Sequence, residues 1–192
     1  MRKATVEITG VSPLSWSRYV DADTLEGETK KDMEGRIWRE RFHVNDEGNV
    51  VIPPMAIKNG LVDAAKYMGE KIPGKGNKTW TGKIEAGILA FTPIDLGVTR
   101  DDLEPLWLPV PGSPGKGKRG TGARVLKCFP QLSKWSGVAE IYIVDDVITA
   151  QVFEHYMQTL GRFVGWGRFR IANGGYYGRF DVGNVTVEQC ST

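Results

Sequence analysis

Two helical patterns, each with a strand pattern before and after it, constrain the fold of this 192-residue chain more than any other feature. In residues 54–68, apolar side chains recur at steps of three and four, with Pro54 at the start and Gly69 directly after. Proline suits the first helical turn and glycine a helix end, so this segment is predicted to be a helix. Residues 149–160 carry a second apolar stripe, and Thr149 is a suitable N-cap.

Strand patterns surround these two helices. Apolar residues alternate with polar ones or cluster in residues 5–9, 84–91, 138–144 and 179–187, which we expect to form the core strands. With the helices they give the order β-α-β-β-α-β, which is that of the ferredoxin-like fold. We therefore predict an α+β protein with a modified ferredoxin-like or RRM core (βαββαβ) and two inserted β-hairpins, in a single domain over residues 1–192.

The two insertions lie at residues 10–52 and 105–129. In the first, Ile37 to Phe42 alternates like a strand, and the turn residues 45–48 lead to a second apolar stretch at 50–52. In the second, two apolar stretches flank a tip rich in Gly, Pro and Lys. Both insertions are predicted to be hairpins that emerge near the ends of the sheet, where a ligand would be met.

Composition argues against several classes of protein. The net charge is only +2, so total charge points to no partner, and the distribution of charge has to be considered instead. Cys128 and Cys190 are the only cysteines, and the only histidines, His43 and His155, are far from them in the sequence. We expect no disulfide framework, no metal site and no cofactor. No apolar run approaches the roughly 18 residues that span a bilayer, and the expectation is a cytoplasmic protein without a signal peptide or a membrane partner.

The 24 glycines gather in three segments that also collect basic residues. Residues 161–180 are the most informative, because they combine arginines with aromatic residues. Arginine forks hold phosphates, and an aromatic face that stacks on an unpaired base contributes about 1–3 kcal/mol. Some of these aromatic residues are expected to belong to the core. The candidate nucleic-acid-binding residues of this segment are Arg162, Trp166, Arg168, Arg170, Tyr176 and Tyr177.

Two further basic glycine loops favour the same ligand. Solvated loops are often rich in lysine, so each loop alone is weak support, but three in one chain are stronger. Arg18 follows the first predicted strand, and Lys58 lies on the polar side of the first helix. The candidates outside the glycine-rich segment are Arg18, Lys58, Lys75, Lys78, Lys116, Lys118, Arg119 and Arg124.

Two segments carry a resemblance to a known family. Residues 51–61, Val-Ile-Pro-Pro-Met-Ala-Ile-Lys-Asn-Gly-Leu, resemble the opening of the first helix in RAMP proteins, the RNA-binding subunits of CRISPR effector complexes. Residues 161–178 resemble the glycine-rich signature loop of that family. Pro54 stands where the family has glycine, and Asn59 replaces the glycine after the lysine. The resemblance implies a modified ferredoxin-like fold, and a thumb-like hairpin at residues 105–129 that wedges bases apart.

The function predicted from these features is binding of single-stranded RNA or DNA, with many copies of the chain coating guide RNA or another strand. The expected partners are the strand, further copies in a homo-oligomer or filament, and other CRISPR effector subunits. Trp16, Trp38 and Trp107 are candidate anchors of such an interface. Residues 9–14 also resemble the start of phage and mobile-element proteins, which leaves a solitary RAMP-like binder open.

Two alternatives follow from the same resemblance. RNA-cleaving members use an aspartate in the loop after the first strand, and Asp21 and Asp23 lie at that place here. A metal-dependent RNA endonuclease is therefore one alternative, although a solvated acidic loop is the simpler interpretation of these carboxylates. The other alternative is a protein mimic that inhibits a CRISPR effector without binding nucleic acid.

Overall fold

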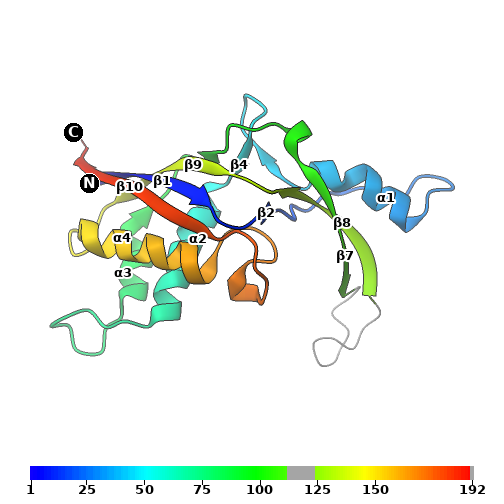
Figure 1. Ribbon diagram of the computed structural model, residues 1–192. Coiled ribbons are helices and arrows are strands. Elements are labelled where there is room, and N and C mark those ends of the chain that lie inside the picture. Colours follow the sequence, from blue (N-terminus) through cyan, green and yellow to red (C-terminus); the bar gives the residue numbers. More distant parts are fainter. Residues whose placement is uncertain (112–123, 191–192) are drawn as a thin grey trace.

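The structure, a computed structural model, describes residues 1–111 and 124–190. Its main sheet has the strand order β10-β1-β9-β5, and every neighbouring pair in it is antiparallel (Figure 1). The strands are β1 (Arg2–Gly10), β5 (Ile88–Leu89), β9 (Ser136–Ile143) and β10 (Phe180–Gln189). In β1 and β9 every second side chain is buried, and polar residues alternate with them, so one face of the sheet forms the core.

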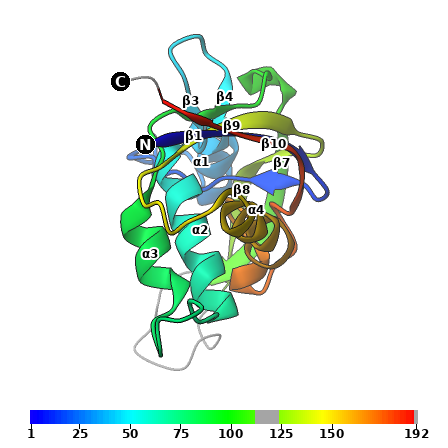
Figure 2. The ribbon, with the colours of Figure 1, turned by 90° about the vertical axis from the view of Figure 1, so that its left-hand side faces the viewer.

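Three helices cover this buried face, namely α2 (Pro54–Met68), α3 (Trp80–Gly87) and α4 (Ala150–Thr159) (Figure 2). Along the chain, α2 lies between β1 and β5, and α4 lies between β9 and β10. The mixture of helices and sheet confirms the predicted α+β class. In the described residues no helix combines the length and apolar character that crossing a bilayer requires.

The ends of α2 and α4 follow the predicted signals. Pro54 occupies the first turn of α2, and Gly69 ends the helix in the left-handed conformation at φ 60°. The hydroxyl of Thr149 accepts a hydrogen bond from the backbone N–H of Val152 and caps α4. A single π-helical turn, η3 (Leu160–Val164), then carries the chain from α4 into its glycine-rich segment.

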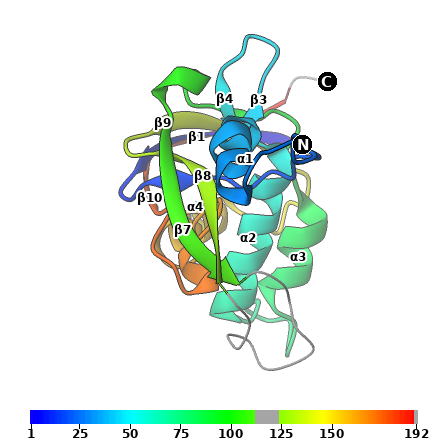
Figure 3. The ribbon, with the colours of Figure 1, turned by 90° about the vertical axis from the view of Figure 1, so that its right-hand side faces the viewer.

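Two small sheets lie beside the main one. The first has the order β2-β8-β7 and the second the order β3-β4-β6. The longest of these strands, β7 and β8, pair antiparallel; they lie to the right of the helical layer in Figure 1 and in front of it in Figure 3. The elements not yet named are β2 (Leu14–Ser15), β3 (His43–Val44), β4 (Val50–Ile52), β6 (Ile94–Asp95), β7 (Glu104–Pro111), β8 (Arg124–Leu132), α1 (Lys30–Ile37), η1 (Trp38–Glu40), η2 (Arg100–Asp102) and η4 (Ile171–Asn173).

The strand predicted at residues 37–42 is wrong. Thr29 and Asp32 form a capping box that starts α1, and the chain continues from this helix into η1. Glu34, Ile37 and Trp38 are buried, as expected for residues three and four apart on one side of a helix. The first insertion is therefore a helix followed by a short β3–β4 pair.

Half of the strand predicted at residues 84–91 is helical. Trp80, Ile84 and Ile88 are buried at steps of four, so the apolar run is one side of α3 and only its end enters the sheet, as β5. The basic glycine loop predicted at residues 71–83 extends past the start of α3 and includes Trp80. The large buried side chain of Trp80 fixes the start of the helix instead.

Candidate nucleic-acid interface

The glycine-rich loop, here residues 165–178, is held against the chain that follows β1. The backbone N–H of Arg168 donates to the carbonyl of Ser15 at 2.7 Å, and that of Gly178 donates to the carbonyl of Pro13 at 2.8 Å. Gly178 has a φ of +71°, and a Cβ atom there would lie 1.9 Å from the carbonyl oxygen of Trp166. Glycine is thus required at this position by both conformation and space.

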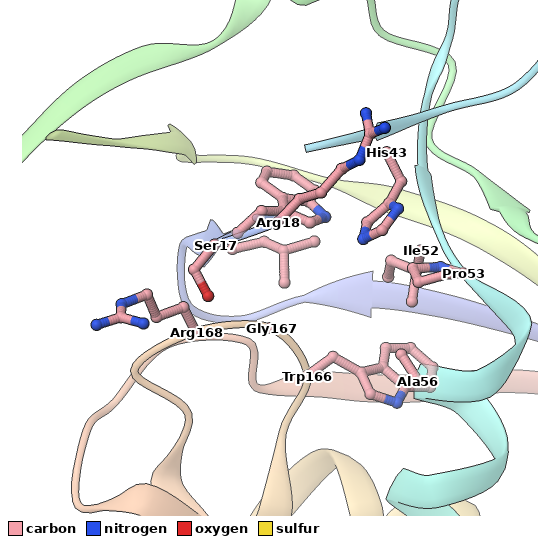
Figure 4. A pocket seen from close by; sticks show the side chains of 11 residues that line it. Ser17, Arg18, His43, Ile52, Pro53, Ala56, Trp166, Gly167 and Arg168 are labelled. Atoms are coloured by element: carbon pink, nitrogen blue, oxygen red, sulfur yellow. The ribbon is translucent and has the colours of Figure 1, made fainter. Parts of the chain in front are cut away.

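Three adjoining pockets run along this loop, and all three are lined by Ser17 and Arg168. Together they form what we call the central groove. The inner pocket, about 230 Å³, lies between the loop and the start of α2 (Figure 4). The hairpin pocket, about 370 Å³, reaches α1, β7 and β8, and the loop pocket, about 450 Å³, lies under residues 173–175. The groove thus connects the glycine-rich loop, the β7–β8 hairpin and the start of α2.

Four cationic side chains line the groove: Arg18, Arg41, Lys127 and Arg168. Glu34 is the one carboxylate among the lining residues, and its charge is already paired. Its oxygens lie 3.0 Å from Arg41 Nη2 and 3.7 Å from Lys127 Nζ, and one of them accepts the backbone N–H of Cys128. Within the described residues, Arg18 and Arg168 form no ion pair. The lining therefore carries an excess of positive charge.

Arg168 and Arg41 lie close to one aromatic ring. The Arg168 guanidinium is 4.4 Å from the centroid of Phe129, and that of Arg41 is 5.5 Å from it. Burial, and then the positive charge of Arg41, lower the pKa of Arg168 from its ordinary value. The Nε–H groups of both arginines are buried without an acceptor among the described residues. Two neighbouring cations, of which only Arg41 pairs with a carboxylate of the described chain, favour an anion such as phosphate in the groove.

The other predicted residues of the glycine-rich segment have different environments. Arg170 pairs with Asp63 at 3.0 Å, and the hydroxyl of the buried Tyr177 donates to Gln131. Tyr176 is the exposed aromatic residue of the loop, with 62% of its surface accessible. Arg162 lies outside the central groove and lines a separate pocket beside β10.

Three tryptophans predicted to act at the surface are packed instead. Trp166 is only 1% exposed, and its ring stacks on Phe180 with a centroid distance of 4.3 Å. Its faces are not open to a base, although one edge lines the inner pocket. Trp16 and Trp38 are also buried, so they do not serve as surface anchors, and Trp107 is half-buried against the core. In each case the apolar ring contributes more as a core residue.

The remaining basic candidates lie outside the lining of the groove. Lys75 and Lys78 are exposed in the loop between α2 and α3, and Figure 1 shows this loop on the other side of the molecule from β8. Lys58 is half-buried on α2, and Arg124 is exposed at the start of β8. The last three candidates, Lys116, Lys118 and Arg119, lie outside the described residues.

Asp21 and Asp23 are exposed in the segment between β2 and α1. The carboxylate of Asp21 accepts a hydrogen bond from the hydroxyl of Tyr19, and the backbone carbonyl of Asp23 accepts one from Arg36. In residues 1–111 and 124–190, no three His, Cys, Asp or Glu side chains lie close enough together to hold a metal ion.

Sequence reasoning missed four lining residues: Ser17, Arg41, His43 and Lys127. Arg41 was assigned to a strand, and no local pattern marks the other three. Ser17, Arg41 and Lys127 meet because β8 packs beside α1, η1 and β2, and His43 joins them because the backbone N–H of Arg18 donates to the carbonyl of Arg41, two residues before His43. Burial, together with the charge of Arg18, lowers the pKa of His43, so its imidazole is neutral at pH 7.

No family model matches the chain, and no curated protein sequence matches it. Several solved structures have a similar fold, among them the following two. A cryo-EM structure of the type III-B Cmr-β complex bound to cognate target RNA contains a chain that matches with a TM-score of 0.52 and 16% identity, over 98% of this chain and 61% of that chain. This chain therefore spans about three fifths of the length of that chain. The crystal structure of Cmr6 from Pyrococcus furiosus matches with a TM-score of 0.52 and 14% identity, over 94% and 98% of the two chains. The likeness shows a shared fold.

Proposed function

We propose that this chain is a RAMP-like protein that binds single-stranded RNA in its central groove. The strand order β10-β1-β9-β5, with α2 and α4 as the two connecting helices, supports a modified ferredoxin-like core in a single domain over residues 1–192. Of the two similar structures, one is a type III-B Cmr-β complex bound to target RNA and the other is Cmr6. They support RNA as the ligand and CRISPR effector subunits as partners.

One observation carries the proposal: the main-chain bonding of the glycine-rich loop places Arg168 at the junction of all three pockets. Arg18 lines two of these pockets and is exposed, so both arginines are available for successive phosphates. Phosphate contacts of this kind bind a strand without reading its sequence. Tyr176, exposed on the same loop, supplies a face for a neighbouring base.

The β7–β8 hairpin is proposed to act as the thumb. Val110, Pro111 and Lys127 belong to this hairpin and line the hairpin pocket, so a strand in the groove passes along the end of the hairpin where Pro111 pairs with Arg124. The hairpin would then separate neighbouring bases and reach the next copy. Copies that bind head to tail form a filament when their rotation does not close into a ring. A CRISPR subunit and a solitary binder share all of these features.

Fluorescence anisotropy tests the proposal. The ligands are single-stranded RNA, single-stranded DNA and duplex RNA, all of the same short length. We expect single-stranded RNA to bind more tightly than the duplex, with an affinity that falls as salt rises, because each bound phosphate releases counterions. Arg18→Ala should weaken binding, and Asp101→Ala, an exposed substitution outside the groove, should not. Absence of binding to every single strand would overturn the proposal and favour the inhibitor hypothesis.

The same samples with magnesium distinguish a nuclease from a binder. A pure binder leaves the strand intact. If the wild-type chain cleaves the strand and Asp21→Asn or Asp23→Asn does not, the endonuclease hypothesis is favoured over the hypothesis of a pure binder. Particle mass measured on strands of increasing length tests the coating step: the bound mass should rise with strand length, whereas a constant mass would leave an isolated binder.

A further inference from the structure

We propose that the inner pocket takes one nucleobase of the bound strand, unstacked from its neighbours, while Arg18 and Arg168 hold the adjoining phosphates. This inference rests on the proposed function, and it adds an enclosed site for one base to the phosphate contacts of the groove and the exposed face of Tyr176. It predicts that the strand binds in a fixed register at this point.

The walls of the inner pocket suit the flat apolar faces of a base. Leu14, Ile52, Pro53 and Ala56 line it together with the two buried indoles, Trp16 and Trp166. Ligand pockets in proteins are typically apolar with a few placed polar groups, and this lining has that composition. An inorganic phosphate would gain no hydrogen bond or charge interaction from these apolar walls.

The charged side chains that line the inner pocket are all positive. Its charged lining residues are Arg18 and Arg168, and none of the lining residues in the described chain is acidic. Figure 4 shows Arg18 and His43 on one side, Trp166 and Ala56 across from them, and Arg168 at one end. An apolar cavity beside two unpaired cations matches a base joined to its anionic backbone, whereas an apolar peptide side chain would leave the arginines without partners.

His43 is placed to contact the edge of the base. Its side chain is half-buried and lines the pocket from β3, facing Arg18. A neutral imidazole offers one donor and one acceptor, which suits the mixed edge of a nucleobase. Since the inner and hairpin pockets share Ser17, Arg18 and Arg168, a base in one and phosphates in the other can belong to the same strand.

A pocket-filling substitution tests this inference. Ala56→Phe places a ring in the inner pocket and leaves both arginines in place. Met55→Phe is the matched control, because Met55 is the preceding residue of α2, is exposed and does not line the pocket. Each protein is titrated with a single-stranded RNA and with a fully abasic strand of equal length, which keeps every phosphate. Thermal melting of both variants checks that they fold.

We expect the wild-type chain and Met55→Phe to prefer the intact strand by more than about tenfold, because a base held in the pocket and a base stacked on Tyr176 both contribute. Ala56→Phe should lose about tenfold of this preference, the contribution of the pocket, while its binding of the abasic strand stays unchanged. His43→Ala, which does not crowd the pocket, should reduce the preference in the same direction.

The failures are distinguishable. If the wild-type chain binds both strands equally, or if Ala56→Phe and His43→Ala retain the full preference, the base pocket is wrong and the phosphate-binding groove stands. If the wild-type chain binds neither strand, the proposed function fails. A 4-thiouridine strand provides a second measurement: crosslinks should map to residues 14–18 or 43, and crosslinks confined to Tyr176 would also overturn the pocket.

Discussion

The glycine-rich loop and the lysine loop, residues 70–79 between α2 and α3, have the same kind of composition and different surroundings. The lysine loop bonds mainly to itself: the backbone N–H of Ile72 donates to Lys78, and that of Lys75 donates to Ile72. The glycine-rich loop bonds instead to residues 13–15, in a distant part of the sequence. Glycine and basic residues therefore mark two loops as phosphate binders, but only one of them lines a groove.

Glycines in the two loops show the same difference on a smaller scale. Gly76 and Gly178 both have positive φ angles, +63° and +71°. No atom lies within 4 Å of a Cβ placed on Gly76, whereas one placed on Gly178 overlaps the backbone of Trp166. In the first loop glycine serves a turn, and in the second it also permits close contact between two chain segments.

The largest expected effect comes from Gly178→Ala. The left-handed conformation costs a residue with a side chain about 1 kcal/mol, and the overlap adds roughly 1–3 kcal/mol, so the free energy of unfolding should fall by about 2–4 kcal/mol. Because the loop must shift to relieve the overlap, RNA binding should fall as well. Chemical denaturation and anisotropy measure the two effects.

Gly76→Ala is the control in the lysine loop. It carries only the conformational cost of about 1 kcal/mol, and RNA affinity should stay unchanged. Equal losses of stability in the two variants would show that the contact between Gly178 and the backbone of Trp166 is not a tight one.

The second effect is electrostatic. Replacing Arg18 and Arg168 together by Ala should reduce the slope of log affinity against log salt by about 1.4, since each phosphate contact to a single strand contributes about 0.7. Lys75→Ala with Lys78→Ala removes the same charge from the lysine loop, and the slope should not change. A slope that falls equally in both double variants would mean that net charge, and not the groove, binds the strand.

The sequence predicted the parts of the fold that have local signals. Pro54 and Gly69 mark the two ends of α2, and Thr149 marks the start of α4; all three act as expected. α3 was missed because Trp80 was assigned to the preceding loop and the apolar residues at 84–91 were interpreted as a strand, although Trp80, Ile84 and Ile88 have helical spacing. Where several apolar residues lie within a few positions, their number favours a buried strand, whereas their spacing here favours a helix. Tertiary packing stabilises the helix in this chain.

The candidate site was predicted only in part, for a similar reason. Arg18 and Arg168 are in the groove, but the same composition also selected Trp166, which is in the core. An aromatic residue among glycines has the same sequence pattern whether its face is open or stacked on Phe180. Arg41 and Lys127 enter the groove through the packing of α1 on β8, where Glu34 joins them, and contacts between distant segments leave no local pattern.

The smallest expected effect separates stacking from charge. Tyr176 is 62% exposed on the glycine-rich loop, and Tyr67, at the end of α2 next to the lysine loop, is 60% exposed. Tyr176→Ala should weaken RNA binding by about fivefold, the lower end of what one stacked base contributes, and should leave the salt slope unchanged because no charge is removed. Tyr67→Ala removes a ring of similar exposure and should change neither the affinity for RNA nor the salt slope. Anisotropy titrations over a range of salt concentrations measure both.

If Tyr176→Ala changes the slope but Tyr67→Ala does not, the loop has moved its arginines, and Tyr176 supports the groove instead of stacking on a base. If the two variants lose affinity equally, exposed aromatic residues contribute wherever they lie, and the glycine-rich loop has no special place in binding.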